Sequence, residues 1–358
     1  MESRGLGTRN VSIDAFRCLL MFLIVLHHAS IRGYWKDETN NFILPLLYTT
    51  LIFWHVDGFI AISGWFGCHF TLVRFSRLFG VMLFYSIFHS CYLYFIMNVP
   101  IYNAIGVHGG WYGNTYLAFM FVAPLINEAL LKLVVTLPRK KVFIIWAIYD
   151  IGMILNWAPY NLFTGVLASG AGGFSIMTFI TVYINVRMIR LLQLETYFTI
   201  RKFCMVCALY FIGCLVFSVS WATYQICAKG STIQWSWVGY TTYNSPHVIL
   251  MAIAVMLAFI KWVRIPHWLC KIVAFISPAM FGVYLLHGAT GFGNYLYLIP
   301  ERWLAESTTL SPVVIVFVAG TFTFFTCIVV DSVRRVVVAP FCKLIFPILR
   351  SWDTKLEL

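Results

Sequence analysis

Apolar residues fill most of the chain in long runs that only short polar segments interrupt. A helix needs about 20 apolar residues to cross the hydrocarbon core of a bilayer, and about ten stretches of the sequence reach that length or come close to it. They lie near residues 13–31, 43–66, 78–97, 113–131, 142–157, 161–185, 203–224, 246–262, 272–290 and 312–331. The join "NWAPYN" between the fifth and sixth stretches is tight, so these two form either separate spans or one re-entrant feature.

Composition points to the same class of protein. Hydrophobic residues make up 61% of the 358 residues, and charged residues make up only 11%. Soluble domains are nearer half apolar and a quarter charged. A water-soluble core could not hide so many apolar side chains, so the sequence predicts an all-α, polytopic transmembrane helical bundle. We expect one integral membrane domain over residues 1–358, surrounded by membrane lipids.

The basic residues indicate how the chain is oriented in the membrane. If the N-terminus is cytoplasmic, about 20 lysines and arginines fall on the cytoplasmic side and about 4 on the outside, with one arginine left inside a span. This bias predicts that both termini are cytoplasmic, with short tails near residues 1–12 and 332–358. It also accounts for the net charge of +12 without a nucleic-acid partner.

Most of the ten cysteines lie inside apolar runs, where a free thiol behaves as a small hydrophobic group. One C-x-x-C pair, Cys204 and Cys207, begins an apolar stretch, and no second pair completes a zinc site. The sequence therefore predicts neither a disulfide framework nor a bound metal.

The first span carries an arginine and a histidine at membrane depth, where such groups usually face the bundle interior or a water-filled cavity. Arg17 and His28 are about three helical turns apart, so they share one face of the helix and lie roughly 16 Å apart along its axis. His27 points about 100° away from His28. Two interpretations remain open: a functional pair, or a snorkelling arginine with a structural histidine.

The second span contains His55 and Asp57 in its middle and Ser63 about two turns further on. A buried carboxylate close to a histidine can orient the imidazole and raise its basicity. A structural Asp–His pair that holds two helices together is the alternative interpretation.

Just beyond this span, Arg74 and Arg77 are three residues apart and therefore neighbours on one helical face at the predicted cytoplasmic boundary. Two guanidinium groups placed in this way suit phosphates, although such a pair also contacts lipid headgroups in many membrane proteins. Further polar candidates are Tyr116 in the fourth span and the pair Tyr284 and His287 in the ninth, which lie on one face.

Together these segments resemble the acyltransferase 3 family of integral membrane acyltransferases over most of the chain. The resemblance rests on Arg17 with His28, on "GFIAISGW" in the second span, on the R-x-x-R of Arg74 and Arg77, and on "WYGNTYLAFMFVAPLIN" with the late "GVYLLH". The chain departs from the family pattern in two places. It lacks the proline that often follows the R-x-x-R, and it lacks the paired phenylalanines that often precede the SG.

The resemblance implies an enzyme that transfers acyl groups other than aminoacyl groups. Such enzymes usually move acetyl from acetyl-CoA to a hydroxyl of a cell-surface polysaccharide or a lipid-linked sugar, so O-acetylation at a bacterial inner membrane is expected. Acetyl-CoA would be a co-substrate and not a tightly bound cofactor. By this resemblance His28 is the catalytic base with Arg17 as its partner, and Arg74 and Arg77 contact the CoA phosphates. The supporting residues would be Asp57, His55, Ser63, Tyr116, Tyr284 and His287.

A different class of protein also fits the buried charges. A polytopic transporter or flippase would use them as a path for a substrate or for protons. An enzyme consumes a thioester while it modifies a hydroxyl, whereas a transporter moves a solute without consuming one.

Overall fold

The computed structural model describes residues 10–34, 51–100, 110–160, 173, 175–229, 242–288 and 292–355. In these ranges the regular structure is α-helical with short 3-10 turns, and no β-strand occurs. The predicted all-α class is therefore confirmed. Five segments are long and apolar enough to cross a membrane: α1 (Val11–Arg32), α5 (Leu72–Phe95), α7 (Gly110–Thr136), His267–Gly288 and α15 (Pro312–Lys355). The total of ten spans and the side of the membrane on which the termini lie stay predictions.

Helices also occupy the other predicted spans as far as these are described. They are α4 (His55–Phe66), α8 (Arg139–Tyr160), α9 (Ile176–Leu191), α10 (Ile200–Lys229) and α11 (Pro246–Lys261). The start of the second predicted span and residues 161–172 of the sixth lie outside the described residues, whereas the join "NWAPYN" belongs to α8 as far as Tyr160. The re-entrant alternative for that join therefore stays a prediction.

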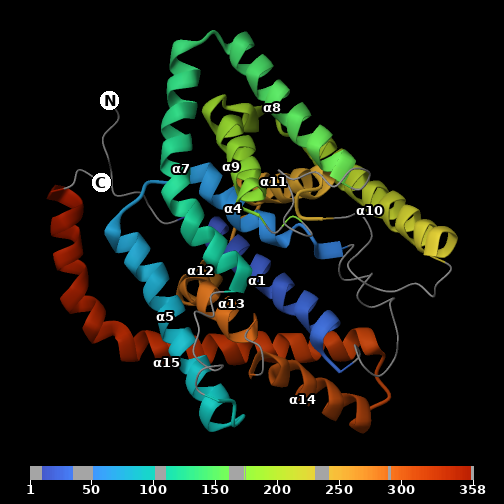
Figure 1. The fold of residues 1–358 in the computed structure, drawn as a ribbon, viewed down its shortest axis with the longest axis vertical. Coiled ribbons are helices and arrows are strands. Elements are labelled where there is room, and N and C mark those ends of the chain that lie inside the picture. Colours follow the sequence, from blue (N-terminus) through green and yellow to red (C-terminus); the bar gives the residue numbers. More distant parts are fainter. Residues whose placement is uncertain are drawn as a thin grey trace.

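Helix α1 lies in the middle of the bundle, with α4 and α11 on one side and α13 (Met280–Gly288) and α15 on the other (Figure 1). It begins at the cap residue Asn10, whose side chain accepts a hydrogen bond from the Ile13 N–H at 3.2 Å. Phe16, Leu20 and Val25 are fully buried against these neighbours. A helix surrounded in this way can hold polar side chains away from lipid, and this makes it suitable for carrying a site.

The ninth predicted span is broken in its middle. It consists of α12 (His267–Ile276), the 3-10 turn η3 (Ser277–Ala279) and α13 (Met280–Gly288). Pro278 lacks a backbone N–H and cannot continue the regular helical hydrogen bonding, which explains the break. Within a membrane such a break is tolerated where it is buried in protein or lines a cavity.

Two segments near the C-terminus differ from the sequence-based expectation. The predicted outer loop before the last span contains a helix, α14 (Phe292–Ser307), which the apolar-run criterion missed because Glu301, Arg302 and Glu306 interrupt it. Helix α15 continues through the residues expected to form a short tail, and its C-terminal part turns away from the long straight part (Figure 1). This part contains Pro340 and Pro347, which loosen a helix locally.

Candidate active site

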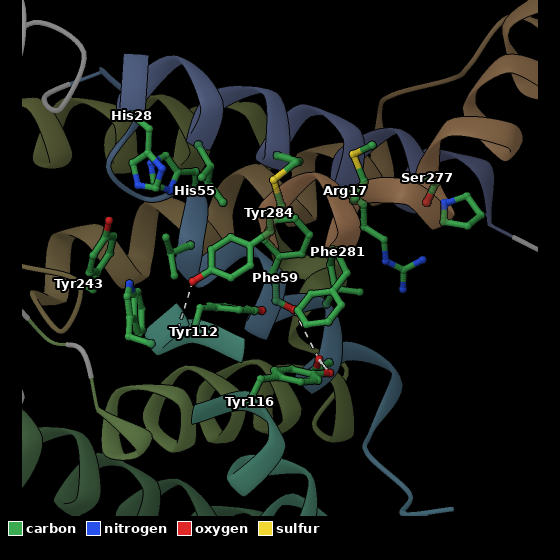
Figure 2. Close-up of a pocket in the computed structure, with 18 residues that line it drawn as sticks. Arg17, His28, His55, Phe59, Tyr112, Tyr116, Tyr243, Ser277, Phe281 and Tyr284 are labelled. Carbon is green, nitrogen blue, oxygen red and sulfur yellow. Dashed lines mark hydrogen bonds between the residues drawn. The ribbon is translucent and has the colours of Figure 1, made fainter. Parts of the chain in front are cut away.

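A cavity of about 240 Å³ lies beside α1, between α4, α7 and the broken span of η3 and α13. Six of the residues selected from the sequence line it: Arg17, His28, His55, Ser63, Tyr116 and Tyr284. Figure 2 shows His28 and His55 near one end and Arg17 with Ser277 near the other, with Tyr112 and Tyr116 on the wall opposite α1. The structure thus brings together side chains from helices that are distant in the sequence.

Arg17 and His28 both face this cavity, whereas His27 does not line it. His27 is buried, and its ring packs 5.5 Å from the His55 ring and 6.0 Å from Phe53, measured between ring centroids. Because the cavity follows α1 from Arg17 to His28, it extends roughly 16 Å along the helix axis.

His28 has a second histidine as its neighbour. The centroids of the His28 and His287 rings are 4.9 Å apart, with 36° between the ring planes. Nδ1 of His287 lies 2.6 Å from the carbonyl oxygen of Val283. A carbonyl can only accept, so His287 Nδ1 is the protonated nitrogen, and a neutral His287 keeps a lone pair on Nε2. Neither His287 Nε2 nor His28 Nδ1 has a hydrogen-bond partner among the described residues. Both nitrogens can therefore form a hydrogen bond with a ligand.

Arg17 is held at the other end of the cavity by an acidic residue that sequence reasoning missed. Its guanidinium is 2.9 Å from Oδ1 of Asp14, and the same carboxylate oxygen accepts a hydrogen bond from the Ser277 hydroxyl at 2.9 Å. Asp14 is buried, while the Arg17 side chain remains 37% exposed. Asp14 therefore connects α1 to the break in the ninth span, and it leaves guanidinium N–H groups of Arg17 for the cavity. The i, i+3 spacing in "DAFR" was the signal for this pair.

Hydroxyl groups line the wall between the two ends. The Ser63 and Tyr116 hydroxyl oxygens are 3.0 Å apart and share a hydrogen bond. The Tyr284 hydroxyl accepts a hydrogen bond from the Tyr112 backbone N–H at 3.3 Å, so its own proton is left for another acceptor. These contacts connect α4, α7 and α13 across the cavity.

The expected pairing of Asp57 with His55 does not form. Both ring nitrogens of His55 and both carboxylate oxygens of Asp57 are buried without a hydrogen-bond partner among the described residues. Residues two apart on a helix point about 200° from each other, so His55 lines the cavity and Asp57 faces elsewhere.

The two arginines of the R-x-x-R lie outside the cavity, at the start of α5. Arg74 donates a hydrogen bond to the His69 carbonyl oxygen at 3.0 Å. Arg77 lies over the Phe346 ring of α15, with its guanidinium carbon 5.4 Å from the ring centroid. The two side chains therefore point to different partners, although they share one helical face.

Aromatic side chains that were not among the predicted site residues also line the cavity. Trp111, Tyr243 and Phe281 line it, and the Trp111 and Tyr243 rings are 5.9 Å apart. Tyr243 also stacks on Phe53 at 4.2 Å. It lies in a long segment between spans, where no helical periodicity indicates which residues turn inward.

Comparison with known families assigns the chain. A family model for acyltransferase family 3, described as an acyltransferase domain, matches residues 10–331. The chain belongs to the acyltransferase 3 family. The match begins at the cap of α1 and ends within α15, so it takes in every element that surrounds the cavity. No curated protein and no solved structure matches the chain. This member of the acyltransferase 3 family is thus a membrane acyltransferase, with apolar helices suited to an integral membrane protein.

Proposed function

We propose that this acyltransferase moves an acyl group, acetyl in the first instance, from acyl-CoA to a hydroxyl of a cell-surface polysaccharide or a lipid-linked sugar. The observation that carries this proposal is that one cavity holds His28 at one end and Arg17 at the other. A base and a cation at opposite ends suit a hydroxyl acceptor and an anionic donor, respectively.

The donor would enter from the cytoplasmic side, where CoA is found and where the basic residues of the chain are expected to gather. The arginines at that end would attract the CoA phosphates through charge-assisted hydrogen bonds. The pantetheine arm is long and mostly uncharged, and a channel of roughly 16 Å along α1 would let it bring the thioester close to His28. Such a channel would let a donor on the cytoplasmic side reach a base that we expect in the outer half of α1.

At the base, His28 would take the proton of the acceptor hydroxyl while the oxygen attacks the thioester carbonyl. The C–O bond forms, the C–S bond breaks, and the CoA thiolate leaves and receives the proton from His28. General-base help of this kind is typically worth about 10²–10⁴-fold in rate. His287, with Nδ1 donating to Val283, would orient His28 or accept its proton through Nε2.

The carbonyl oxygen becomes negative during this attack and needs hydrogen-bond donors. Tyr284 would be one donor, because its oxygen already accepts from Tyr112 and its proton faces no described acceptor in the cavity. The Ser63–Tyr116 pair lies nearer the Arg17 end and would position the donor arm there. His55 completes the wall near His28, whereas Asp57 would act only through the packing of α4.

The acceptor would approach the His28 end. Trp111 and Tyr243 offer aromatic faces there, and such faces suit the apolar side of a sugar ring. We infer that the enzyme acts in the inner membrane of a bacterium and modifies an exopolysaccharide or its lipid-linked precursor.

The proposal is tested by incubating the purified protein in lipid nanodiscs with isotope-labelled acetyl-CoA and lipid-linked oligosaccharides. Free CoA and an acceptor heavier by one acetyl group are the expected products. A mass comparison of surface glycans from cells with and without the gene would identify the acyl group. Movement of a glycan across proteoliposomes without consumption of acetyl-CoA would instead support a transporter.

A further inference from the structure

The short linker between α4 and α5 contacts two arginines from different helices. It begins at Gly67, which caps α4 with its N–H donating to the Ser63 carbonyl oxygen at 3.0 Å. Ser63 lines the cavity, so the linker starts one helical turn from the cavity wall. The linker therefore lies next to the Ser63–Tyr116 end of the cavity.

Arg187 of α9 lies against the first residue of the linker. A Cβ atom at Gly67 would be only 3.1 Å from the guanidinium carbon of Arg187, and the backbone there has a φ of 75°, which favours glycine. The next residue, Cys68, is fixed by its N–H donating to the hydroxyl of Tyr183 at 3.0 Å, and Tyr183 lies one turn before Arg187 on α9. The hydrogen bond between Cys68 and Tyr183 therefore holds α9, which carries Arg187, against the linker.

Arg74 lies against the other part of the same linker through its hydrogen bond to the His69 carbonyl oxygen. Gly67 and His69 are two residues apart, so their Cα atoms are at most about 7 Å apart. Both arginines lie within electrostatic range of the Cys68 thiol between them. The guanidinium groups of Arg74 on α5 and Arg187 on α9 therefore both contact the three-residue segment 67–69.

The described carboxylates of this region contact groups other than Arg187 and Arg74, and Oε2 of Glu195 has no hydrogen-bond partner among the described residues. Glu195 pairs with Arg190 at 2.6 Å, and Arg190 in turn lies over the Trp65 ring at 4.7 Å. Asp353 accepts hydrogen bonds from the Leu72 and Val73 N–H groups at the start of α5. Neither Arg187 nor Arg74 has an ion pair with a carboxylate among the described residues, and Nε of Arg187 is buried without a hydrogen-bond partner there.

We propose that Arg187 and Arg74 together bind a phosphate of acyl-CoA at the linker between α4 and α5, and that Arg187 takes the role expected for Arg77. Planar guanidinium groups bind phosphate oxygens in bidentate fashion, and two of them on one short linker suit the anionic end of CoA. Arg77 is turned to the Phe346 ring of α15. The assignment rests on the proposed function, since it names residues that would hold that donor.

The test is the affinity of purified, nanodisc-embedded protein for acetyl-CoA, measured by calorimetry. Arg187→Ala and Arg74→Ala are each expected to raise the Kd about tenfold, and Arg187→Lys less, because it keeps the charge and loses the bidentate geometry. Arg77→Ala is expected to stay within about twofold of wild type. Lys140→Ala is the matched control: it removes one exposed charge from the same predicted side of the membrane. A wild-type Kd in Arg187→Ala would overturn the assignment.

Acetyl-pantetheine separates a lost phosphate contact from a disturbed fold, because it carries the thioester arm without phosphates. Its affinity is expected to be equal in wild type and Arg187→Ala, whereas equal weakening of both ligands would overturn the site. Arg187 could instead hold the phosphate of a lipid. In that case anionic lipid would stabilise the wild type more than Arg187→Ala, and the two proteins would bind acetyl-CoA equally well. This result would also overturn the proposed phosphate site. Failure of wild type to bind acetyl-CoA at all would reject the proposed function and this site with it.

Discussion

The imidazole rings of His28 and His287 lie 4.9 Å apart, although they come from the first helix and from the broken ninth predicted span. The hydrogen bond from His287 to Val283 selects one tautomer of that ring. His28, the base proposed for the reaction, therefore lies beside a ring whose lone pair is on Nε2. Both imidazoles are carried by helices, α1 and α13.

Replacing His28 with alanine is expected to lower acyl transfer by at least about 10²-fold, because general-base help is lost. His27→Ala is the matched control, since that neighbouring histidine does not line the cavity. Both variants are compared with wild type in labelled-acetyl transfer, at equal amounts of folded protein. Transfer at the wild-type rate in His28→Ala would remove this residue from the mechanism.

The hydrogen bond between Ser63 and Tyr116 is expected to act as one unit. Ser63→Ala and Tyr116→Phe each break it, so each should lower kcat by a similar factor, and the double variant should be hardly worse than either single one. A double-mutant cycle on kcat measures this coupling. Fully additive losses would show that the two hydroxyls serve the reaction separately.

Asp14 is expected to position Arg17. Asp14→Ala leaves the Arg17 guanidinium and the Ser277 hydroxyl without their acceptor, at a cost of about 1–3 kcal/mol for a buried polar group. We expect a lower Tm and a higher KM for acyl-CoA, with Asp14→Asn intermediate because it keeps an acceptor oxygen. Unchanged KM and Tm in Asp14→Ala would contradict this.

Gly282 allows α13 to approach a buried ion pair on α15. A Cβ at Gly282 would overlap the carboxylate of Asp331, which is fully buried and 2.7 Å from Arg334. Gly282→Ala is expected to destabilise the fold by about 1–3 kcal/mol through overpacking. Gly288→Ala on the same helix is the control, because its Cβ would meet no atom of the described residues within 4 Å. Thermal unfolding followed by tryptophan fluorescence distinguishes the two.

Asp353 is expected to fix the start of α5 and thereby the position of Arg74. Its carboxylate accepts from Leu72 N–H at 2.6 Å and from Val73 N–H at 3.3 Å. Asp353→Ala removes these contacts, which are worth about 1 kcal/mol for a helix cap, and should weaken acetyl-CoA binding more than it lowers kcat. Asp353→Asn keeps an acceptor and should restore most of the affinity. Equal loss of kcat and affinity would point to a general disturbance.

The helices and their polar faces were predictable from local pattern. In a bilayer the backbone N–H and C=O groups must form their hydrogen bonds within the protein, so a long apolar run has few alternatives to a helix. Helices α1, α5, α7 and α15 follow such runs. The prediction failed for α14, where charged residues break the apolar run, and for Asp57, whose sequence neighbour His55 faces another direction. Helical arithmetic placed Arg17 and His28 on one side of α1 and turned His27 away, as the structure shows.

By itself, the sequence determined an all-helical membrane chain of the acyltransferase 3 family with polar groups on defined faces. Helix periodicity and the apolar length needed to cross a bilayer depend only on residues close together in the sequence. Only the tertiary structure decided which of these faces meet. His287 beside His28, Asp14 beside Ser277 and Arg187 beside Gly67 join residues far apart in the chain, and such contacts depend on how whole helices pack. The packing of helices depends on how many side chains fit together at once, and a local sequence pattern does not contain this information.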